Sequence, residues 1–485
     1  MLETENSLLD RLKSYGESDH YPFHMPGHKR KSIVPFPDLY SIDITEIDGF
    51  DNLHHAEGIL KESMDQAAKI YGSDQTYYLV NGSTCGILSA ICACAKPGDG
   101  ILMARNCHKS AFHGVILQNL MPFYVYPGYL KDFGIHGGIE AEDVELALKE
   151  NPNIKAVLIV SPTYEGVVSD VRAIADVAHR HHVPLIVDEA HGAHFPFAEH
   201  EFPKSAIACG ADLVIQSLHK TLPSPTQTAI LHVNRGFVDT KKLERYLGMF
   251  QSSSPSYVFL AAMEQCIRYM DQIGREEMRR YADQLNAFYN RLNDLKVLKV
   301  LKRDICKEVS VYDWDMSKIV ISTKGSGLSG ADLSDILRKN YHLEMEMSAP
   351  EYMIGMTTLM DTKDGYRRLA DALLEIDLQL VRHGRVRAKR ELAYDQKQEM
   401  PKAKVIMGPA DAMHAAGAEC VLVESEGKVS QEFLYLYPPG IPILVPGEKI
   451  TGEILERVTW YSEMGLSVQG LADPTVSSII TVAEE

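Results

Sequence analysis

A lysine at the end of an apolar run is the first residue of this sequence whose position suggests chemistry. Leu213-Val214-Ile215 predicts a buried strand, and Ser217-Leu218-His219-Lys220 follows it. Burying an ammonium without a partner is costly, so a lysine in this place needs a reason. A lysine whose surroundings lower its pKa can attack an aldehyde as the neutral amine. Lys220 is therefore a candidate for a Schiff base.

Two further predicted strands end in polar residues. Ser161-Pro162-Thr163-Tyr164 follows the strand at 156–160, and Asp188-Glu189-Ala190-His191 follows the strand at 185–187. Ligands of open α/β sheets bind outside the carboxyl ends of strands, so the three polar ends are expected to face one crevice. Asp188 should be largely buried and needs a cationic or hydrogen-bonding partner. A structural ion pair and a protonated pyridine nitrogen both meet that need.

The turn Asn81-Gly82-Ser83-Thr84 lies between a predicted strand and a predicted helix. Free N–H groups and the helix dipole favour an anion there, although a simple helix cap is an alternative. A P-loop is excluded, because no Gly-Lys-Ser/Thr completes the pattern. Ser217 and His219 could hold further phosphate oxygens. With His108 as a candidate for ring stacking, these residues describe a site for a cofactor with a phosphate, an aromatic ring and an aldehyde.

A metal site is a competing interpretation. Asp188, His191 and His194 supply three possible ligands within seven residues. Their spacing on a segment leaving a strand, without a His-Glu-x-x-His pattern, does not favour zinc. We therefore expect no metal, and a metal-dependent hydrolase remains a rival function.

Composition limits the class of protein. A chain of 485 residues predicts two or three domains, and its net charge of −17 argues against a nucleic-acid surface. The eight cysteines are scattered without a Cys-x-x-Cys pair, which indicates reduced thiols in the cytoplasm. Neither a signal peptide nor an apolar run long enough to cross a bilayer is evident. We expect a cytoplasmic protein that binds neither membrane nor nucleic acid.

The pattern of elements predicts an α/β fold with a large, mostly parallel sheet. An amphipathic helix is expected up to about residue 20, packed on a partner surface, followed by a loop at 23–29 that either lies on the surface or lines the site. A long helix is predicted at 256–294, and a second α/β unit after it. The expected strands are at 77–80, 101–103, 123–126, 156–160, 185–187, 213–216, 229–233 and 318–322, and the principal helices are at 58–71, 170–182 and 329–341.

Four parts of the chain are expected. They are an N-terminal helix and linker (1–30), a cofactor-binding major domain (31–295), a small α/β domain (296–380), and a linker helix with a C-terminal domain (381–485). Residues 380–400 are rich in charged and amide side chains, which is typical of a solvated helix or linker.

The motifs, taken in order, resemble those of the Orn/Lys/Arg decarboxylases in their short bacterial form. That family has the aspartate-aminotransferase-like fold, which is the fold-type I fold of pyridoxal-phosphate enzymes, with a large mostly parallel sheet domain and smaller α/β C-terminal domains. The match runs through nearly the whole chain, at 23–29, 51–54, 81–84, 105–110, 161–166, 188–194, 217–220, 252–255 and 437–442.

The resemblance implies a role for each matching residue. Lys220 would bind pyridoxal phosphate covalently, Asp188 would pair with its pyridine nitrogen, and His108 and Ala190 would cover the two faces of its ring. Ser252 would come from a neighbouring subunit, and Glu346 would lie on the substrate side. The implied cofactor-binding set is Gly82, Ser83, Thr84, His108, Asp188, Ala190, His191, Ser217, His219, Lys220 and Ser252.

The function that follows is decarboxylation of a basic amino acid with pyridoxal 5'-phosphate as cofactor. Arginine to agmatine is favoured by the resemblance, with lysine to cadaverine or ornithine to putrescine as alternatives. Because the receiver-like wing domain of longer relatives has no counterpart here, we expect a homodimer or a dimer of dimers. The rivals are an aminotransferase or other lyase on the same fold, the metal-dependent hydrolase, and a cofactor-binding protein without turnover.

Overall fold

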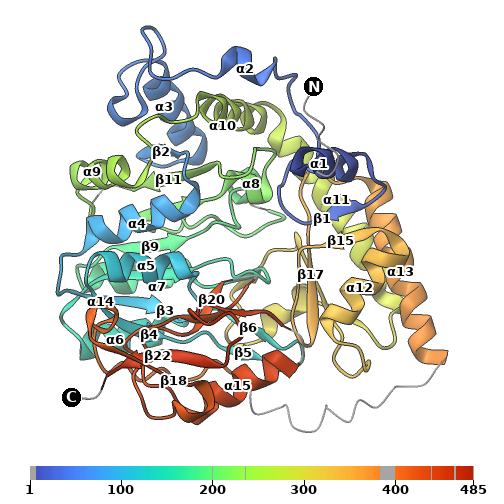
Figure 1. Cartoon of the computed structure of the whole chain (residues 1–485). Helices are drawn as coiled ribbons and strands as arrows, with labels where there is room; N and C mark the ends of the chain where they lie inside the picture. Colours follow the sequence, from blue (N-terminus) through green and yellow to red (C-terminus); the bar gives the residue numbers. More distant parts are fainter. Residues whose placement is uncertain are drawn as a thin grey trace.

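A seven-stranded sheet forms the centre of the large domain in the computed structural model (Figure 1). The structure describes residues 7–198, 200–234, 236–382, 399–437, 440–463 and 466–483. The strand order is β2-β11-β10-β9-β7-β3-β4, and β11 runs antiparallel to both of its neighbours while the other pairs are parallel. The predicted mostly parallel sheet is therefore confirmed. Its strands are β2 (Gln75–Leu79), β3 (Gly100–Ala104), β4 (Met121–Val125), β7 (Ile154–Val160), β9 (Leu185–Asp188), β10 (Leu213–Gln216) and β11 (Ala229–Val233).

Helices cover this sheet because its central strands are apolar on both faces. Every residue of β3, β9, β10 and β11 is buried, which is typical of a sheet between two helical layers. The helices of the large domain are α3 (Ile59–Tyr71), α4 (Gly82–Cys94), α5 (Lys109–Leu117), α6 (Ala141–Glu150), α7 (Val171–Arg180), α8 (Leu218–Thr221), α9 (Thr240–Phe250) and α10 (Tyr257–Tyr269), with the short α2 (Leu39–Ile42) before them.

The carboxyl ends of β7, β9 and β10 lie side by side. Asp188 at the end of β9 pairs with Val160 on one side and with Ile215 on the other. The Ser161 amide continues the ladder by donating to the Asp188 carbonyl over 3.2 Å, and the Glu189 amide donates to the Ile215 carbonyl over 2.9 Å. The segments after the three strands therefore begin at one edge of the sheet, as the sequence predicts.

The small domain is built on a four-stranded antiparallel sheet in the order β12-β14-β17-β16. The N-terminal strand β1 pairs in parallel with β15, so the start of the chain joins this domain. The strands of the small domain are β1 (Tyr21–Phe23), β12 (Lys299–Val300), β14 (Lys318–Ser322), β15 (Leu343–Met345), β16 (Met347–Ser348) and β17 (Tyr352–Met356). Its helices are α11 (Arg275–Arg291), α12 (Gly330–Tyr341) and α13 (Lys363–Arg382). Two-stranded ribbons elsewhere in the molecule pair β5 (Tyr129–Leu130) with β6 (Ile135–His136) and β8 (Val167–Val168) with β13 (Asp313–Trp314).

The long helix predicted at 256–294 is confirmed as helical backbone from 257 to 294, but it is not α-helical throughout. A π-helical turn over Met270–Gly274 separates α10 from α11, which ends at Arg291. At this turn Gly274 lies so close to the buried Met270 that an added Cβ would stand 2.9 Å from the methionine methyl carbon. The wider turn therefore holds a close contact that a regular side chain at position 274 would disturb.

The N-terminal helix α1 (Leu8–Glu17) ends three residues before the predicted end at about residue 20, and residues 1–6 of that prediction lie outside the described residues. A capping box formed by Ser7 and Asp10 begins it. Leu8, Leu9 and Leu12 are exposed, so the expectation that they pack on a partner stays a prediction. Among the described residues, no helix is both long and apolar enough to cross a membrane.

The C-terminal domain has its own small apolar core, which includes Leu434, Leu444, Ile454 and Ile479. Most of the linker predicted at 380–400 lies outside the described residues. The elements of the domain are α14 (Pro409–His414), β18 (Gly417–Val421) paired with β22 (Ser478–Val482), a sheet of β20 (Ile441–Leu444), β19 (Leu434–Leu436) and β21 (Val468–Gln469), and α15 (Gly452–Glu463).

A buried arginine fastens the C-terminal domain to the large domain. Arg105, just after β3, donates to the carbonyls of Pro442 (2.6 Å) and Ile443 (3.0 Å) and to the Glu448 carboxylate (3.2 Å). Both charged side chains are 1% exposed. Because the Lys109 amide also donates to the Gly440 carbonyl over 3.0 Å, the C-terminal domain is held against the segment that carries His108.

Replacing Arg105 by methionine should loosen this attachment, because it leaves the Glu448 carboxylate buried without its cation. We expect a loss of about 3–5 kcal/mol in the free energy of unfolding of the C-terminal domain. Guanidinium unfolding followed by Trp460 fluorescence, in a Trp314→Phe background, measures it. Arg338→Ala removes an exposed ion pair to Asp335 and should cost about 1 kcal/mol or less. Equal losses in the two variants would contradict the attachment.

Candidate active site

A cavity of about 90 Å³ lies at the carboxyl edge of the large sheet. Six of the site residues predicted from the sequence line it, from four different segments of the chain. The lining residues are Ser83, Ile87, Asn106, His108, His136, Val160, Thr163, Tyr164, Glu165, Asp188, Ala190, His191, Lys220 and Ile441.

Lys220 is carried on the short helix α8, directly after β10 and Ser217. Its Nζ lies 3.0 Å from Nε2 of His191. Burial lowers the pKa of Lys220, against the opposing effect of the Asp188 and Glu346 carboxylates. A lowered pKa increases the fraction of neutral amine, which is the form that attacks an aldehyde. The lysine is therefore suited to covalent chemistry at this cavity.

Asp188 presents a buried carboxylate to the same cavity. Among the described residues, the hydrogen bond recorded for that carboxylate comes from the Ala190 amide, over 3.1 Å. Burial raises the pKa of Asp188, and the nearby Lys220 acts in the opposite direction. The carboxylate consequently keeps capacity for a further cationic partner at the cavity.

His108 is held in one orientation by the helix that it precedes. It is the N-cap of α5, and its Nδ1 accepts the Ser110 amide over 3.2 Å, which leaves the ring proton of the neutral form on Nε2. Burial, with a smaller contribution from Lys220, lowers the pKa of His108 to about 3. The ring is therefore neutral near pH 7 and can lie flat against an aromatic ligand.

The start of α4 offers donors for an anion. Gly82 opens the helix with φ +73°, a left-handed conformation that favours glycine, and Asn81 makes no side-chain cap. The first N–H groups of the helix are thus available to a ligand. Three residues before Lys220, the Ser217 hydroxyl is fully buried and has no hydrogen-bond partner within the described part of the chain. A buried hydroxyl in that state suits a site that a ligand completes.

His219 is a weaker phosphate ligand than the sequence suggests. Its Nδ1 lies 2.9 Å from the Thr228 carbonyl and therefore carries the proton. Burial lowers the pKa of His219 to about 4, so its Nε2 is an acceptor in the neutral ring. The side chain can donate to a phosphate only if the phosphate charge raises that pKa.

Thr84 and Ser252 do not line the cavity of their own chain. Both are exposed, and the Ser252 amide donates to Asn81 Oδ1 over 3.1 Å, at the start of α4. The roles expected for them stay predictions.

Glu346 is held by two groups on opposite sides of its carboxylate. The Tyr164 hydroxyl donates to Oε1 over 2.6 Å, and the Met25 amide donates to Oε2 over 2.8 Å. The Tyr164 ring also meets the His191 ring edge-on, with centroids 4.9 Å apart and an interplanar angle of 65°. A second cavity of about 460 Å³ includes Glu346 and shares His136, Glu165 and Ile441 with the first, so the two are adjacent.

Several of these residues were not singled out from the sequence. Tyr164 stands in one of the three polar strand ends, and that position was its signal. The Met25 contribution is a backbone N–H, which no residue type reveals, and the sequence leaves the motif at 23–29 as either a surface loop or a site-lining segment. Four further residues line the cavity without being identified from the sequence as site residues: Asn106, His136, Thr163 and Glu165.

The three candidate metal ligands do not come together. Asp188 and His191 line the cavity, whereas His194 is fully buried against Asp315, with Nε2 3.3 Å from Oδ1. In the described ranges, no group of three His, Cys, Asp or Glu side chains is arranged to hold a metal ion. The metal-hydrolase hypothesis therefore has no geometric support in this part of the molecule.

The residues at the cavity fit pyridoxal phosphate. The partly buried Lys220 matches its aldehyde, the buried Asp188 carboxylate its pyridine nitrogen, and the neutral His108 its ring. The first N–H groups of α4, where Ser83 lines the cavity, match its phosphate, and the buried Ser217 hydroxyl, three residues before Lys220, is a further donor without a partner among the described residues. On a large mostly parallel sheet with a small second domain, this defines an enzyme of fold-type I. An alanine–glyoxylate aminotransferase from Nostoc sp. shares the fold, with a TM-score of 0.56 at 14% identity over 74% of this chain and 96% of its own.

The chain belongs to the Orn/Lys/Arg decarboxylase family. Residues 6–319 match the family's major domain and residues 390–471 match its C-terminal domain. An arginine decarboxylase of Bacillus subtilis is 33% identical over 100% of this chain and 99% of its own length. The crystal structure of the Francisella novicida lysine decarboxylase LdcF superposes with a TM-score of 0.79, at 20% identity, over 98% of this chain and 80% of that one. The family resemblance expected from the motifs is confirmed.

Replacing Lys220 by alanine should abolish covalent attachment of pyridoxal phosphate while the fold is kept. After incubation with the cofactor, borohydride reduction and digestion, mass spectrometry should find the cofactor mass on the Lys220 peptide of the unchanged protein and on no peptide of the variant. Lys155→Ala, at an exposed lysine of β7, is the matched control and should label normally. A label on another lysine of the unchanged protein would refute the assignment.

Proposed function

We propose that this protein decarboxylates arginine to agmatine, with pyridoxal 5'-phosphate as its cofactor. Family membership supports decarboxylation of a basic amino acid. The observation that carries the choice of arginine is the full-length similarity to the arginine decarboxylase of Bacillus subtilis. The lysine decarboxylase LdcF supports lysine less, because its 20% identity establishes the fold alone.

In this proposal each group of the cofactor has a partner in the chain. Lys220 would hold the cofactor covalently, and Asp188 would be the partner of its pyridine nitrogen. His108 and Ala190 would contact the ring. The phosphate would be held by the start of α4 (Gly82, Ser83 and Thr84), by Ser217 and His219, and by Ser252 of a second subunit. When bound, pyridoxal phosphate supplies an electron sink for the electron pair left behind as the carboxylate departs as CO2.

Two residues of the chain would hold or move protons. Asp188 would hold a proton at the pyridine nitrogen, because a buried carboxylate is stabilised by a cation at that position. Lys220, whose amine lies at the cavity, would be the group that delivers a proton to the substrate α-carbon. His191 Nε2, 3.0 Å from Lys220 Nζ, orients that amine as a hydrogen-bond acceptor, since burial lowers the pKa of His191 well below its usual value and keeps the ring neutral.

Glu346 is the group that we assign to the cationic end of the substrate. Two hydrogen bonds, from Tyr164 and Met25, hold its carboxylate in one orientation. A planar guanidinium can pair with a fixed carboxylate through two parallel hydrogen bonds, whereas an ammonium presents a point charge. A rigidly held Glu346 therefore suits arginine in particular.

We also propose that the enzyme is a cytoplasmic homodimer or dimer of dimers. All eight cysteines lie in the described residues and are free thiols, which fits a reducing compartment. The exposed Ser252 and Thr84 beside the start of α4 are accessible to a second subunit. A shared site would make an isolated subunit inactive.

The purified protein loaded with pyridoxal phosphate should release CO2 from arginine, with agmatine as the amine product. Parallel incubations with arginine, lysine and ornithine, with CO2, amine and keto acid all quantified, test the reaction and the substrate together. We expect kcat/KM for arginine to exceed the other two. An aminotransferase shares Lys220 and Asp188, and keto acid without CO2 would establish that rival instead.

Mixing two inactive variants tests the shared site. In a heterodimer of Lys220→Ala and Ser252→Ala subunits, one site carries both defects and the other carries neither, if Ser252 serves the neighbour. We expect each variant alone to have strongly reduced activity, and mixtures that exchange subunits to recover up to about half of the unchanged specific activity per heterodimer. The absence of recovery despite subunit exchange, verified by differently tagged chains, would place Ser252 outside the neighbour's site.

A further inference from the structure

The N-terminal arm (residues 21–29) links the small domain to the active site. It begins as β1, beside β15, and then reaches the helix that carries Lys220, where the Gly27 amide donates to the His219 carbonyl. The sequence singled out its motif without separating a surface loop from a site-lining segment. Its contacts identify one buried side chain that organises the arm.

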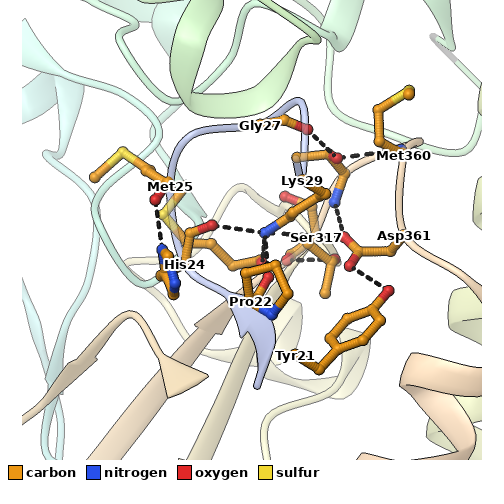
Figure 2. Close-up of polar contacts among 12 residues, drawn as sticks. Tyr21, Pro22, His24, Met25, Gly27, Lys29, Ser317, Met360 and Asp361 are labelled. Atoms are coloured by element: carbon orange, nitrogen blue, oxygen red, sulfur yellow. Dashed lines mark hydrogen bonds and ion pairs between the residues drawn. The ribbon is translucent and has the colours of Figure 1, made fainter. Parts of the chain in front are cut away.

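That side chain is Lys29. It is 6% exposed as a residue, and its Nζ donates to the carbonyls of Pro22 (2.9 Å), His24 (2.8 Å) and Met356 (2.8 Å). An ammonium has three N–H donors, so each is used. Two acceptors belong to the arm itself and the third to the end of β17. Figure 2 shows Lys29 folded back beneath the arm with these bonds converging on it.

A carboxylate completes the surroundings of this cation. Asp361 Oδ2 lies 4.0 Å from Lys29 Nζ, and its side chain is fully buried. The Tyr21 hydroxyl donates to Asp361 Oδ1 over 2.9 Å, and the Thr358 amide donates to Oδ2 over 2.7 Å. Both ends of the arm are thus tied to one loop of the small domain, at 358–361.

The part of the arm between these ties meets the active site at two points. The Met25 amide donates to Glu346 Oε2 over 2.8 Å. The Gly27 amide donates to the His219 carbonyl over 2.6 Å, and an added Cβ on Gly27 would stand 2.6 Å from the Leu222 carbonyl oxygen. Glycine is therefore required where the arm lies against α8. The Gly27 carbonyl in turn accepts the Thr358 hydroxyl over 2.7 Å.

Burying an ammonium costs free energy that a well-packed apolar side chain would not. The positions of the acceptors give the Lys29 ammonium a function, because the Pro22 and His24 carbonyls, on either side of Phe23, both accept from its Nζ. The arm bends at residues 24 and 25, and this bend directs the Met25 N–H to Glu346. An apolar residue at position 29 could fill the volume without fixing the bend.

We propose that Lys29 is a positioning residue for the substrate-side carboxylate. Its ammonium holds the arm in the conformation in which the Met25 amide fixes one oxygen of Glu346, while Tyr164 fixes the other. This deepens the function proposed above and rests on it for the role of Glu346. Without Lys29, Glu346 keeps its charge but loses its fixed orientation toward the cationic end of the substrate.

Steady-state kinetics with arginine test whether Lys29 acts through Glu346. The variants to compare are Lys29→Met, Glu346→Ala and the double variant. Misplacing a binding group by a fraction of its contact distance can cost about 10²-fold in kcat/KM, so we expect that order of loss in Lys29→Met, mainly as a higher KM for arginine. In the Glu346→Ala background the same substitution should change KM by less than about threefold, because the two residues act through one contact. Multiplying effects would mean that Lys29 acts only on general stability.

Lys31→Met is the matched control. Lys31 is an exposed lysine two positions away whose Nζ donates to the Met360 carbonyl, on the same loop of the small domain, over 2.5 Å. The Lys31 side chain does not bind the Pro22 and His24 carbonyls that Lys29 binds. The KM of Lys31→Met for arginine should therefore stay within about twofold of the value for the unchanged enzyme. A KM change equal to that of Lys29→Met would overturn the proposal.

Amide hydrogen exchange gives a reading that does not depend on turnover. Exchange of the Met25 amide should accelerate in both Lys29→Met and Glu346→Ala and stay unchanged in Lys31→Met. This holds even if the protein decarboxylates no amino acid, so failure of the proposed function and failure of the Lys29 role are separable. Unchanged Met25 exchange in folded Lys29→Met would overturn the role. If that variant does not fold, Lys29→Gln, which retains two N–H donors, takes its place in both measurements.

Discussion

Desolvation of charge at one edge of the large sheet is the constraint on which this structure depends. Asp188 ends β9 and Lys220 follows β10, and the two strands are parallel neighbours. Burial raises the pKa of the acid and lowers the pKa of the lysine, so each needs the other or a ligand that replaces it. A cofactor with an aldehyde and a basic ring nitrogen meets both needs. The fold thus destabilises the charged forms of Asp188 and Lys220 by burying them, and a bound cofactor of this kind would offset that cost.

Segments remote in the sequence keep that edge enclosed. Arg105 and Glu448 hold the C-terminal domain against the segment that carries His108. Lys29 ties the N-terminal arm to the small domain, and the Gly27 amide of that arm donates to the His219 carbonyl on α8. In both places a buried cation takes backbone carbonyls as partners. Such bonds fix the course of the main chain more directly than apolar contacts can, because hydrogen bonds are directional. The C-terminal domain therefore contributes Ile441 to the lining of the cavity, and the N-terminal arm contacts the site through Glu346 and α8.

Local patterns predicted much of this molecule. The apolar runs at 185–187 and 213–216 identified central strands, and the positions of Asp188 and Lys220 after them placed both at one edge. Local patterns failed where packing decides. The helix at 256–294 contains a π turn, at which Gly274 lies close to Met270, and the residue pattern does not predict it. His194 leaves the candidate metal set because Asp315, far along the chain, binds it.

The sequence by itself determined the order of the site residues along the chain and the strand or helix end to which each belongs. They are an anion-binding turn at Gly82, a histidine at 108, a carboxylate at 188 and a lysine at 220. These follow from short-range rules, since a strand end and a helix start are local features. The tertiary structure alone decided the contacts of Glu346, Met25 and Lys29. Two of those contacts join a side chain to a backbone group more than three hundred residues away, Glu346 to the Met25 amide and Lys29 to the Met356 carbonyl. No local residue pattern encodes where a main-chain N–H will point.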